Sequence, residues 1–518
     1  MPHDVITDTT GPTGPTDTPP SPVHDSPGAT RRGLLAGAAA LGGFVVLGRA
    51  APALAAPKVS ERAWRDLDRR FSGALLRPGA SGFRGAAQPN NLLYADRLPA
   101  GIARCRTARD VATAITWCRE HDVPLAPRGG GHSYAGYSTT RGLLVDLAAL
   151  NEASFDENTG RVTVGAGVKN RKLYEVLAGV GVSITHGRCY GVGVGGFLLG
   201  GGIGFNMRLH GVGSDKLVET DVVGADGVLR SARAGGEEDL FWACRGDAGR
   251  NFGINTRFVV ETFDVDDITA FDLTWSRKPE QVAEALIPAL QRATRRLGSR
   301  VTLRAVTPQD RREGRDVRVS LLGQLHGPRA ELLEILAPVF AVAPALKRTI
   351  RTLPYWEGQK LLTEEGGPEH YKERSRFVDT PFDGAALDEA FRHARRFPGT
   401  GGSASLKLFQ TGKTMNEMPA RSTAFVHRRS QWLFSTAFTF EESDGRRTVA
   451  AATDWLDETY EAMVPFCGEG AFQNFPDPAL RDWATQYYGV NLARLREVKA
   501  AVDPDDVFRF GQSIRGSA

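Results

Sequence analysis

Two glycine-rich segments most constrain what this chain can fold into. The first, PLAPRGGGHSYAGYS, runs from Pro124 to Ser138, and the second, CYGVGVGGFLLGGGIGF, runs from Cys189 to Phe205. Glycine reaches positive φ and lets the backbone approach a ligand closely because it has no Cβ. Successive N–H groups in such a turn form a concavity for an anion such as pyrophosphate. We therefore expect loops that hold a phosphate-bearing ligand, with His132 within reach of whatever the phosphates carry.

The residues around the first segment predict alternating helices and strands. Thr107 can cap a helix whose apolar residues recur at helical spacing up to Cys118, and an extended stretch follows from Val123 to Ala126. RGLLVDLAALN and GRVTVGAGV predict short strands, and NRKLYEVLAGVGVS predicts another helix. After Phe258, strands such as ITAFDLTW and DVRVSLLGQL alternate with helices such as EQVAEALIPALQRATRRL. An α+β fold is expected, with two domains because 518 residues exceed one ordinary core.

The charge balance and the absence of several motifs exclude some functions. The 64 Lys and Arg residues against 60 Asp and Glu residues leave a net charge of +4, and basic residues form no block of five. We therefore expect no nucleic-acid partner. The sequence contains no H-E-x-x-H, C-x-x-C or G-x-S-x-G pattern, so neither a metal site nor a serine hydrolase is indicated. The cysteines are too few and scattered for a disulfide framework, although one bridge is possible: Cys105, Cys118, Cys189, Cys244 and Cys467.

Residues 1–57 are expected to form a disordered leader and an export signal rather than part of the fold. Arg31 and Arg32 precede a Gly/Ala-rich apolar run that ends near Gly48, and residues 53–55 (Ala-Leu-Ala) form a small-x-small cleavage pattern. These features are typical of a twin-arginine signal. A membrane anchor is the alternative, but the run is shorter than the ~20 apolar residues of a span. We expect export by the twin-arginine machinery to an extracellular, periplasmic or cell-wall space, without a stable membrane span.

The second segment also matches a dinucleotide fingerprint. Gly191, Gly193 and Gly196 fit G-x-G-x-x-G, and Asp215 follows about twenty residues later. A Rossmann unit requires a hydrophobic strand that runs directly into the first glycine, whereas residues 186–189 (His-Gly-Arg-Cys) intervene here. A nicotinamide cofactor is therefore disfavoured.

Four stretches together resemble the berberine-bridge-enzyme-like flavoproteins of the vanillyl-alcohol oxidase superfamily. They are RGGGHSYAGYS, CYGVGVGGFLLGGGIG, DLFWACRGDAGRNFGINTRF and YYGVNLARLREVKAAVDPDDVFRFGQSI, in this order along the chain. The resemblance implies a two-lobed PCMH-type FAD-binding domain over residues 58–263 and an α+β substrate domain with an antiparallel sheet over residues 264–455. A berberine-bridge-type segment, residues 456–518, is expected to return to the FAD domain.

The resemblance implies FAD bound covalently. By position in the family motifs, His132 attaches to the 8-methyl group of the isoalloxazine and Cys189 attaches at position 6. Arg188, next to that cysteine, is expected to help lower the thiol pKa from its usual value of about 8.5. The further expected cofactor contacts are Arg128, Gly129, Gly130, Gly131, Ser133, Gly191, Gly193, Val194, Gly195, Gly196, Gly200, Ile254, Asn474 and Asn491.

The activity implied is that of an oxidase acting on a small molecule. Hydride would pass from an alcohol or hemiacetal carbon of a sugar or secondary metabolite to FAD, and O2 would be reduced to H2O2. Val192 occupies the position where the family's valine admits oxygen; a packing valine is the alternative. These features favour an oxidase over a dehydrogenase.

The sequence departs from the family at its usual proton acceptor. Related oxidases carry Y-x-N-Y where this chain has Phe472 and Phe475, and phenylalanine cannot accept a proton. Tyr134 is the first candidate base and Tyr488 a second. Alternatively, the protein is a biosynthetic flavoenzyme for oxidative cyclisation or dehydrogenation that needs no tyrosine base. A catalytically silent flavin-binding or ligand-binding protein is the third possibility.

Overall fold

The computed structural model describes residues 59–516, so the predicted leader and export signal lie outside the described residues. The described residues belong to one compact unit. Among them, no helix combines the length and apolar character needed to cross a bilayer. The five cysteines all carry free thiols, so the possible disulfide is not formed.

The first lobe contains a small sheet with the strand order β1-β2-β4-β3. Its strands are β1 (Ala74–Leu76), β2 (Gly101–Arg104), β3 (Leu125–Arg128) and β4 (Leu143–Asp146). Strands β2 and β3 both run parallel to β4, and helix α3 (Ala108–Glu120) connects them. The helix predicted after Thr107 is confirmed, and Thr107 forms a capping box with Asp110. The first glycine segment begins where β3 ends.

A second sheet in the same lobe is antiparallel, with the order β5-β6-β10-β8-β9. Its strands are β5 (Ala153–Asp156), β6 (Arg161–Gly165), β8 (Leu217–Val223), β9 (Leu229–Arg233) and β10 (Ile254–Glu261). The strand and helix predicted after Gly160 are confirmed as β6 and α4 (Asn170–Val180). The second glycine segment contains the short helix α5 (Val194–Leu199). Both sheets share one apolar core.

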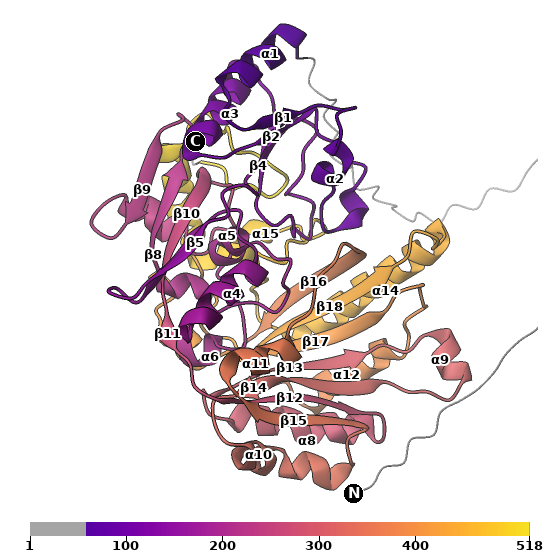
Figure 1. Cartoon of the computed structure of the whole chain (residues 1–518). Coiled ribbons are helices and arrows are strands. Elements are labelled where there is room, and N and C mark those ends of the chain that lie inside the picture. Colours follow the sequence, from indigo (N-terminus) through magenta and orange to yellow (C-terminus); the bar gives the residue numbers. More distant parts are fainter. Residues whose placement is uncertain (1–58, 517–518) are drawn as a thin grey trace, which may run out of the picture. The chain divides into compact units, whose positions relative to one another are not determined.

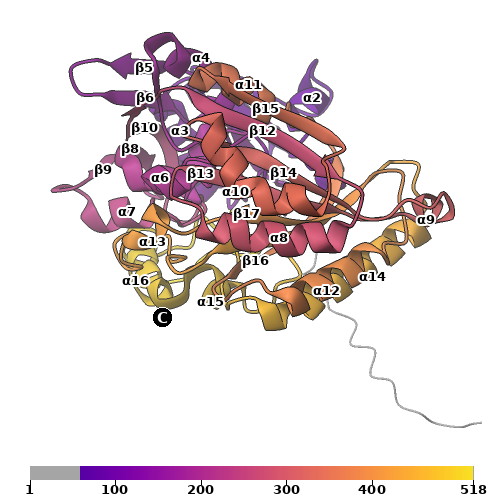
Figure 2. The same ribbon diagram turned by 90° about the horizontal axis from the view of Figure 1, so that it is seen from below.

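The chain then forms a seven-stranded antiparallel sheet with the order β15-β12-β14-β13-β17-β18-β16 (Figure 1). The strands are β12 (Ile268–Trp275), β13 (Leu297–Arg304), β14 (Arg318–Leu325), β15 (Lys347–Leu353), β16 (His370–Val378), β17 (Ala404–Gln410) and β18 (Trp432–Phe440). Helices α8 (Pro279–Arg292), α10 (Arg329–Val342), α12 (Gly384–Ala394) and α14 (Arg446–Met463) bury apolar side chains against one face of this sheet (Figure 2). The other face is turned toward the glycine segments. The predicted α+β class is confirmed.

The last segment packs against the first lobe. Helices α15 (Trp483–Tyr488) and α16 (Leu492–Val502) contribute Tyr488 and Leu495 to the core of that lobe. Asp477, which precedes them, forms a buried ion pair with Arg374 of β16, with Nε and Oδ2 2.7 Å apart. The segment therefore joins the first lobe to the large sheet.

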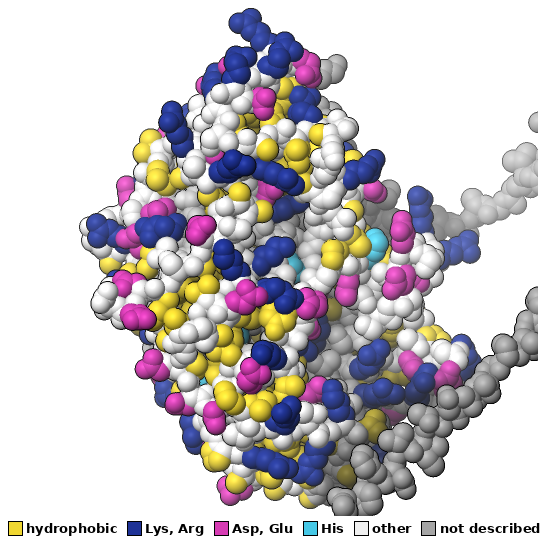
Figure 3. All heavy atoms as spheres, viewed as in Figure 1, with side chains coloured by type: hydrophobic (Ala, Val, Ile, Leu, Met, Phe, Trp, Pro, Cys, Tyr) yellow, Lys and Arg dark blue, Asp and Glu magenta, His cyan; other side chains and the backbone are white. Residues whose placement is uncertain are grey.

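The remaining helices and strands have two to ten residues each. They are α1 (Glu61–Arg70), α2 (Phe83–Ala87), β7 (Val182–Ser183), α6 (Met207–His210), α7 (Glu238–Ala243), β11 (Phe263–Asp264), α9 (Pro308–Arg312), α11 (Tyr355–Leu362) and α13 (Thr414–Glu417). Basic and acidic side chains are interspersed over the face shown in Figure 3.

Candidate functional site

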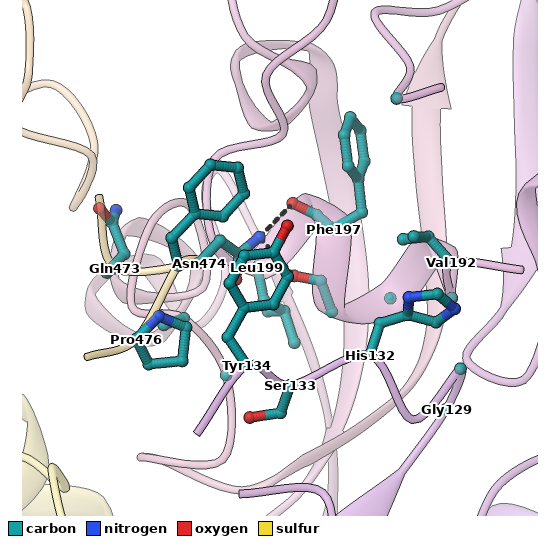
Figure 4. A pocket seen from close by; sticks show the side chains of 18 of the residues that line it. Gly129, His132, Ser133, Tyr134, Val192, Phe197, Leu199, Gln473, Asn474 and Pro476 are labelled. Carbon is teal, nitrogen blue, oxygen red and sulfur yellow. Dashed lines mark hydrogen bonds between the residues drawn. The ribbon is translucent and has the colours of Figure 1, made fainter. Parts of the chain in front are cut away.

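A cavity of about 390 Å³ lies where the two glycine segments meet the large sheet and the last segment. This volume is in the range of small-molecule and cofactor sites. The first segment contributes His132 and Tyr134, the second contributes Val192, and the last contributes Asn474 (Figure 4). Cys189 of the second segment also lines the cavity. The cavity thus gathers residues that are far apart in the sequence.

The two glycine segments cross with their backbones in contact. A Cβ placed on Gly130 would lie 2.1 Å from the backbone nitrogen of Gly193, and a Cβ on Gly193 would lie 2.3 Å from that of Gly130. Neither clash can be relieved by a side-chain rotation because both involve backbone atoms. Glycine is therefore required at this crossing, which fixes the position of the second segment against the first.

The first segment presents amide groups without protein partners. Among the hydrogen bonds of the described residues, no backbone N–H from Gly130 to Tyr134 finds an acceptor. The buried side-chain oxygens of Gln473 and Gln512, which also line the cavity, lack partners as well. Buried polar groups are ordinarily hydrogen-bonded. This donor-rich, apolar-walled cavity therefore fits a large polar cofactor with phosphates and a flat ring.

His132 and Cys189 lie next to each other. A Cβ on Gly366 would come within 3.4 Å of the Cys189 Sγ and 3.5 Å of the His132 Cε1, so both side chains border the same glycine. Burial, reinforced by the charge of Lys169, lowers the pKa of His132 to about 4. The imidazole is consequently neutral at physiological pH and has a free lone pair for a nucleophilic reaction.

The thiol of Cys189 has a carboxylate neighbour that the sequence analysis missed. The Sγ of Cys189 donates a hydrogen bond to Oε1 of Glu364 at 2.9 Å. Burial and the negative charge of Glu364 raise the pKa of Cys189 to about 12, although the charge of Arg188 acts in the lowering direction. Arg188, which is ion-paired with Glu364 at 3.3 Å, thus acts in the expected direction, but burial and Glu364 outweigh it and the thiol pKa is not lowered.

Glu364 belongs to a loop, residues 364–367, that lies between α11 and β16 and contacts the second glycine segment. The N–H of Tyr190 donates to the Glu364 carbonyl at 2.9 Å, and the N–H of Glu364 donates to the Arg188 carbonyl at 3.0 Å. From the first lobe, the amide of Asn90 donates to the carbonyl of Gly367 at 2.9 Å. The loop is thus hydrogen-bonded to the first lobe on both sides of Cys189.

Most of the predicted cofactor contacts lie in the wall of the cavity. Those that line it are Gly129, Gly130, Gly131, His132, Ser133, Cys189, Gly193, Gly195, Gly196, Ile254 and Asn474. The others, which are not in its lining, are Arg128, Gly191, Val194, Gly200 and Asn491.

Three of these residues have structural partners. The guanidinium of Arg128 donates to the carbonyls of four residues, including Ser138 at 2.8 Å. The side chain of Asn474 occupies the space that a Cβ on Gly200 would need, and its Nδ2 donates to the Phe197 carbonyl at 3.3 Å (Figure 4). Asn491 donates to backbone carbonyls outside the cavity, Ala420 among them. Their contacts therefore shape the loops around the site.

The predicted catalytic residues all line the cavity, but the two tyrosines differ in whether their hydroxyl groups are already hydrogen-bonded. Tyr134 stacks on Phe475 with ring centroids 4.7 Å apart, and burial together with the charge of Glu373 raises its pKa well above the usual value. The hydroxyl of Tyr488 donates to the backbone carbonyl of Asp247 at 2.9 Å. Val192 is half-buried in the wall. Of the two tyrosines, only Tyr488 uses its hydroxyl in a hydrogen bond to the backbone, so Tyr134 is the better candidate to contact a substrate.

The large sheet supplies charged residues that the sequence analysis did not single out. Arg300 of β13, Lys407 of β17 and Glu373 of β16 line the cavity. They alternate with apolar residues that face the helices, such as Leu406 and Leu408 around Lys407. This alternation of charged and apolar residues can be seen in the sequence. It does not identify a cavity wall, however, because a strand with one face in water has the same pattern.

Comparisons with known proteins agree with this site. The family model described as FAD binding domain matches residues 99–233, and the one described as Berberine and berberine like matches residues 471–515. These ranges contain both glycine segments and the Asn474 segment. Both matches support a berberine-bridge-enzyme-like FAD-linked oxidoreductase.

Individual relatives of this oxidoreductase extend over nearly the whole fold. The uncharacterized FAD-linked oxidoreductase YgaK of Bacillus subtilis is 29% identical, over 83% of this chain and 94% of the relative. The carbohydrate oxidase of Microdochium nivale is 28% identical, over 85% and 92%. The solved structure of Physcomitrella patens BBE-like 1 has a TM-score of 0.79 at 25% identity, covering 88% of this chain and 99% of that one.

This berberine-bridge-enzyme-like protein is accordingly an enzyme with FAD as its cofactor and a small molecule as its substrate. FAD as the cofactor is confirmed, and the FAD-binding match over residues 99–233 contains the glycine crossing.

Proposed function

We propose that this enzyme is an exported oxidase that carries FAD on His132 and Cys189, oxidises a hydroxyl or hemiacetal group of a sugar or secondary metabolite, and passes the electrons to O2 to form H2O2. The observation that carries this proposal is the joint placement of an imidazole and a thiol beside Gly366 in the FAD cavity. The export part rests on Arg31, Arg32 and the apolar run that follows them.

The surroundings of each residue support attachment. The imidazole of His132 is neutral, since burial lowers its pKa to about 4. The thiol of Cys189 keeps its proton at neutral pH, but the proton points at Glu364. Burial opposes ionisation of Glu364, yet the charge of Arg188, the thiol hydrogen bond and the charge of Arg300 outweigh it and lower its pKa. Glu364 would thus be an ionised acceptor for the thiol proton if the sulfur adds to the flavin ring; the ring would lose its C6 proton, keep the electron pair and be reoxidised by O2.

When bound, FAD supplies hydride acceptance from the substrate carbon and reoxidation by O2. The protein supplies position, a proton acceptor and oxygen access. Tyr134, whose pKa is raised, holds the substrate oxygen as a hydrogen-bond donor and passes the substrate proton onward. Glu373, whose charge acts on Tyr134 and which Lys407 and Ser435 hold in place through hydrogen bonds, would receive it. Val192 leaves an opening for O2 beside the second glycine segment.

The mass of the denatured protein tests the attachment. Trypsin releases residues 129–141 with His132 and residues 189–208 with Cys189, and we expect both peptides joined through one FAD. Cys189→Ala keeps FAD on the first peptide alone, and His132→Ala keeps it on the second. The double variant should release all yellow colour into the acid supernatant. Release of the colour from the unmodified protein would show that neither bond exists.

One observation favours a second candidate. Phe472 and Phe475 stand where related oxidases have tyrosines, and Phe472 is fully buried among aromatic side chains. A flavoenzyme for oxidative cyclisation or dehydrogenation, which needs no tyrosine base, fits that wall as well. Anaerobic mixing with a panel of sugars and alcohols distinguishes them: flavin bleaching followed by H2O2 release on admitting air supports the oxidase. Lasting yellow colour with every compound supports a silent binding protein.

A further inference from the structure

The wall that the large sheet presents to the FAD cavity carries three charged side chains among aromatic ones. Strands β13, β17, β18 and β16 are neighbours in this wall (Figure 1). Arg300 lies opposite Phe409 in the β13–β17 register, and Lys407 reaches across β18 to Glu373 of β16. Charged groups inside an apolar wall are expensive to bury without partners, so their pairing indicates what the cavity is built to bind.

The charges on this side of the cavity do not cancel. Lys407 Nζ lies 3.2 Å from Glu373 Oε1, and Arg188 Nη2 lies 3.3 Å from Glu364 Oε2. Arg300 forms no ion pair or side-chain hydrogen bond with any residue of the range 59–516, and its buried Nε has no partner. Two cations are therefore neutralised by two carboxylates, and the guanidinium of Arg300 is the surplus charge.

This surplus charge persists under physiological conditions. Burial and the nearby charge of Arg188 lower the pKa of Arg300 to about 10, which still leaves it protonated at neutral pH. The planar fork of an arginine binds a carboxylate through two parallel hydrogen bonds. An incoming carboxylate thus satisfies N–H donors of a guanidinium whose Nε has no hydrogen-bond partner and which lies over the Phe409 ring, 5.7 Å from its centroid.

The oxidised cofactor does not provide this anion. Arg300 lines the same cavity as the attachment residues His132 and Cys189, and the charge of Glu364, the hydrogen-bond partner of Cys189, acts on it. FAD carries its negative charges on the phosphates, and the oxidised ring is neutral. A second arginine in the lining, Arg250, already donates to the Tyr137 carbonyl at 2.8 Å. Arg300 is therefore available to the substrate.

We propose that the substrate is an acid, and that the guanidinium of Arg300 binds its carboxylate while the carbon to be oxidised faces the flavin. The substrate class is then hydroxy acids, such as uronic acids or hydroxylated arylalkanoic acids, rather than neutral sugars or alcohols. This inference rests on the proposed function, because it needs the flavin ring in the cavity.

Matched ligands test the proposal with the purified yellow enzyme. Galacturonate is compared with galactose, and mandelate with 1-phenylethane-1,2-diol, by titrating the visible flavin spectrum without oxygen and by measuring kcat/KM. We expect at least one acid to bind roughly 10- to 100-fold more tightly than its neutral partner, the range of one charge-assisted pair. Arg300→Met should abolish that preference and leave the neutral ligand unchanged, and Arg300→Lys should restore part of it.

Arg304→Met is the matched control, because Arg304 lies on the same strand but is exposed; it should keep the preference. The proposal is wrong if neither acid binds more tightly than its neutral partner. It is also wrong if Arg300→Met weakens acid and neutral ligand equally, since Arg300 would then serve the flavin or the fold. Acid precipitation of the same samples reports separately whether FAD is attached, so a failure of the proposed attachment is recognised independently.

Discussion

At the scale of single residues, the Cys189 thiol shows how neighbours of opposite charge decide reactivity. Arg188 favours the thiolate, whereas burial and Glu364 disfavour it, and the balance raises the pKa to about 12. The reactive form is therefore scarce unless the proton is removed in the same step as bond formation. Glu364 consequently has opposite effects on two reactions of this sulfur: it hinders spontaneous ionisation and assists attachment to the flavin.

Alkylation of Cys189 separates these effects. In flavin-free protein at pH 8, iodoacetamide should label residues 189–208 roughly 50-fold more slowly than a free thiol of pKa about 8.5. The rate should increase about tenfold per pH unit between pH 7 and 10. Glu364→Gln should speed labelling, because a negative charge is removed, but slow the formation of the C–S bond with FAD. Mass spectrometry of the peptide measures both, and slower labelling in the variant would contradict this account.

At the scale of elements, the crossing of the two glycine segments fixes the FAD cavity. Gly130 and Gly193 touch through their backbones, so even one methyl group must push the segments apart. We expect Gly130→Ala to destabilise the protein by roughly 3 kcal/mol, as overpacking against a backbone does, and to prevent flavin loading.

Gly179→Ala is the control for this substitution. Gly179 lies in helix α4, and a Cβ there meets nothing within 4 Å. The variant should be about 0.5–1 kcal/mol more stable, since alanine is the better helix residue, and it should load FAD normally. Denaturant unfolding followed by circular dichroism measures the free energy of unfolding of both variants. Equal stability of the two variants would show that the glycine crossing does not restrict residue size.

The sequence predicted the elements of the first lobe because its signals are local. Thr107 caps α3, and the glycines around His132 and Cys189 identify both loops without reference to the rest of the chain. Arg300, Glu364 and Glu373 were not predicted, because their position in the cavity depends on strand order and on a loop that reaches the other lobe. No local pattern distinguishes a strand face turned to a cavity from one turned to water.

At the scale of the whole molecule, several histidines are buried in the neutral form. Burial lowers the pKa of His186 and His326 to about 4 and that of His427 to about 3. Below pH 6.5 these histidines are protonated in the unfolded chain but stay neutral in the folded protein. The free energy of unfolding therefore falls as the pH falls toward 4. Burial of Asp247 raises its pKa to about 7, which acts in the opposite sense and offsets one histidine.

Acidification should therefore destabilise the enzyme. The shift of His186 from 6.5 to about 4 corresponds to roughly 3 kcal/mol, at about 1.4 kcal/mol per pKa unit. Allowing for Asp247, we expect the thermal midpoint to fall by roughly 5 °C between pH 6.5 and 4.5. His427→Gln should flatten this dependence, and scans by circular dichroism at constant ionic strength measure it. A midpoint that rises on acidification would contradict the assignment of neutral buried histidines.

The loop of residues 364–367 ties the sulfur of one lobe to a carboxylate of the other. A chain whose first lobe alone has folded holds the thiol but lacks its proton acceptor. Linkage of the flavin through Cys189 would then be completed only after the lobes have docked. The mass of each molecule would then show, even after folding has ended, whether its two lobes had docked correctly.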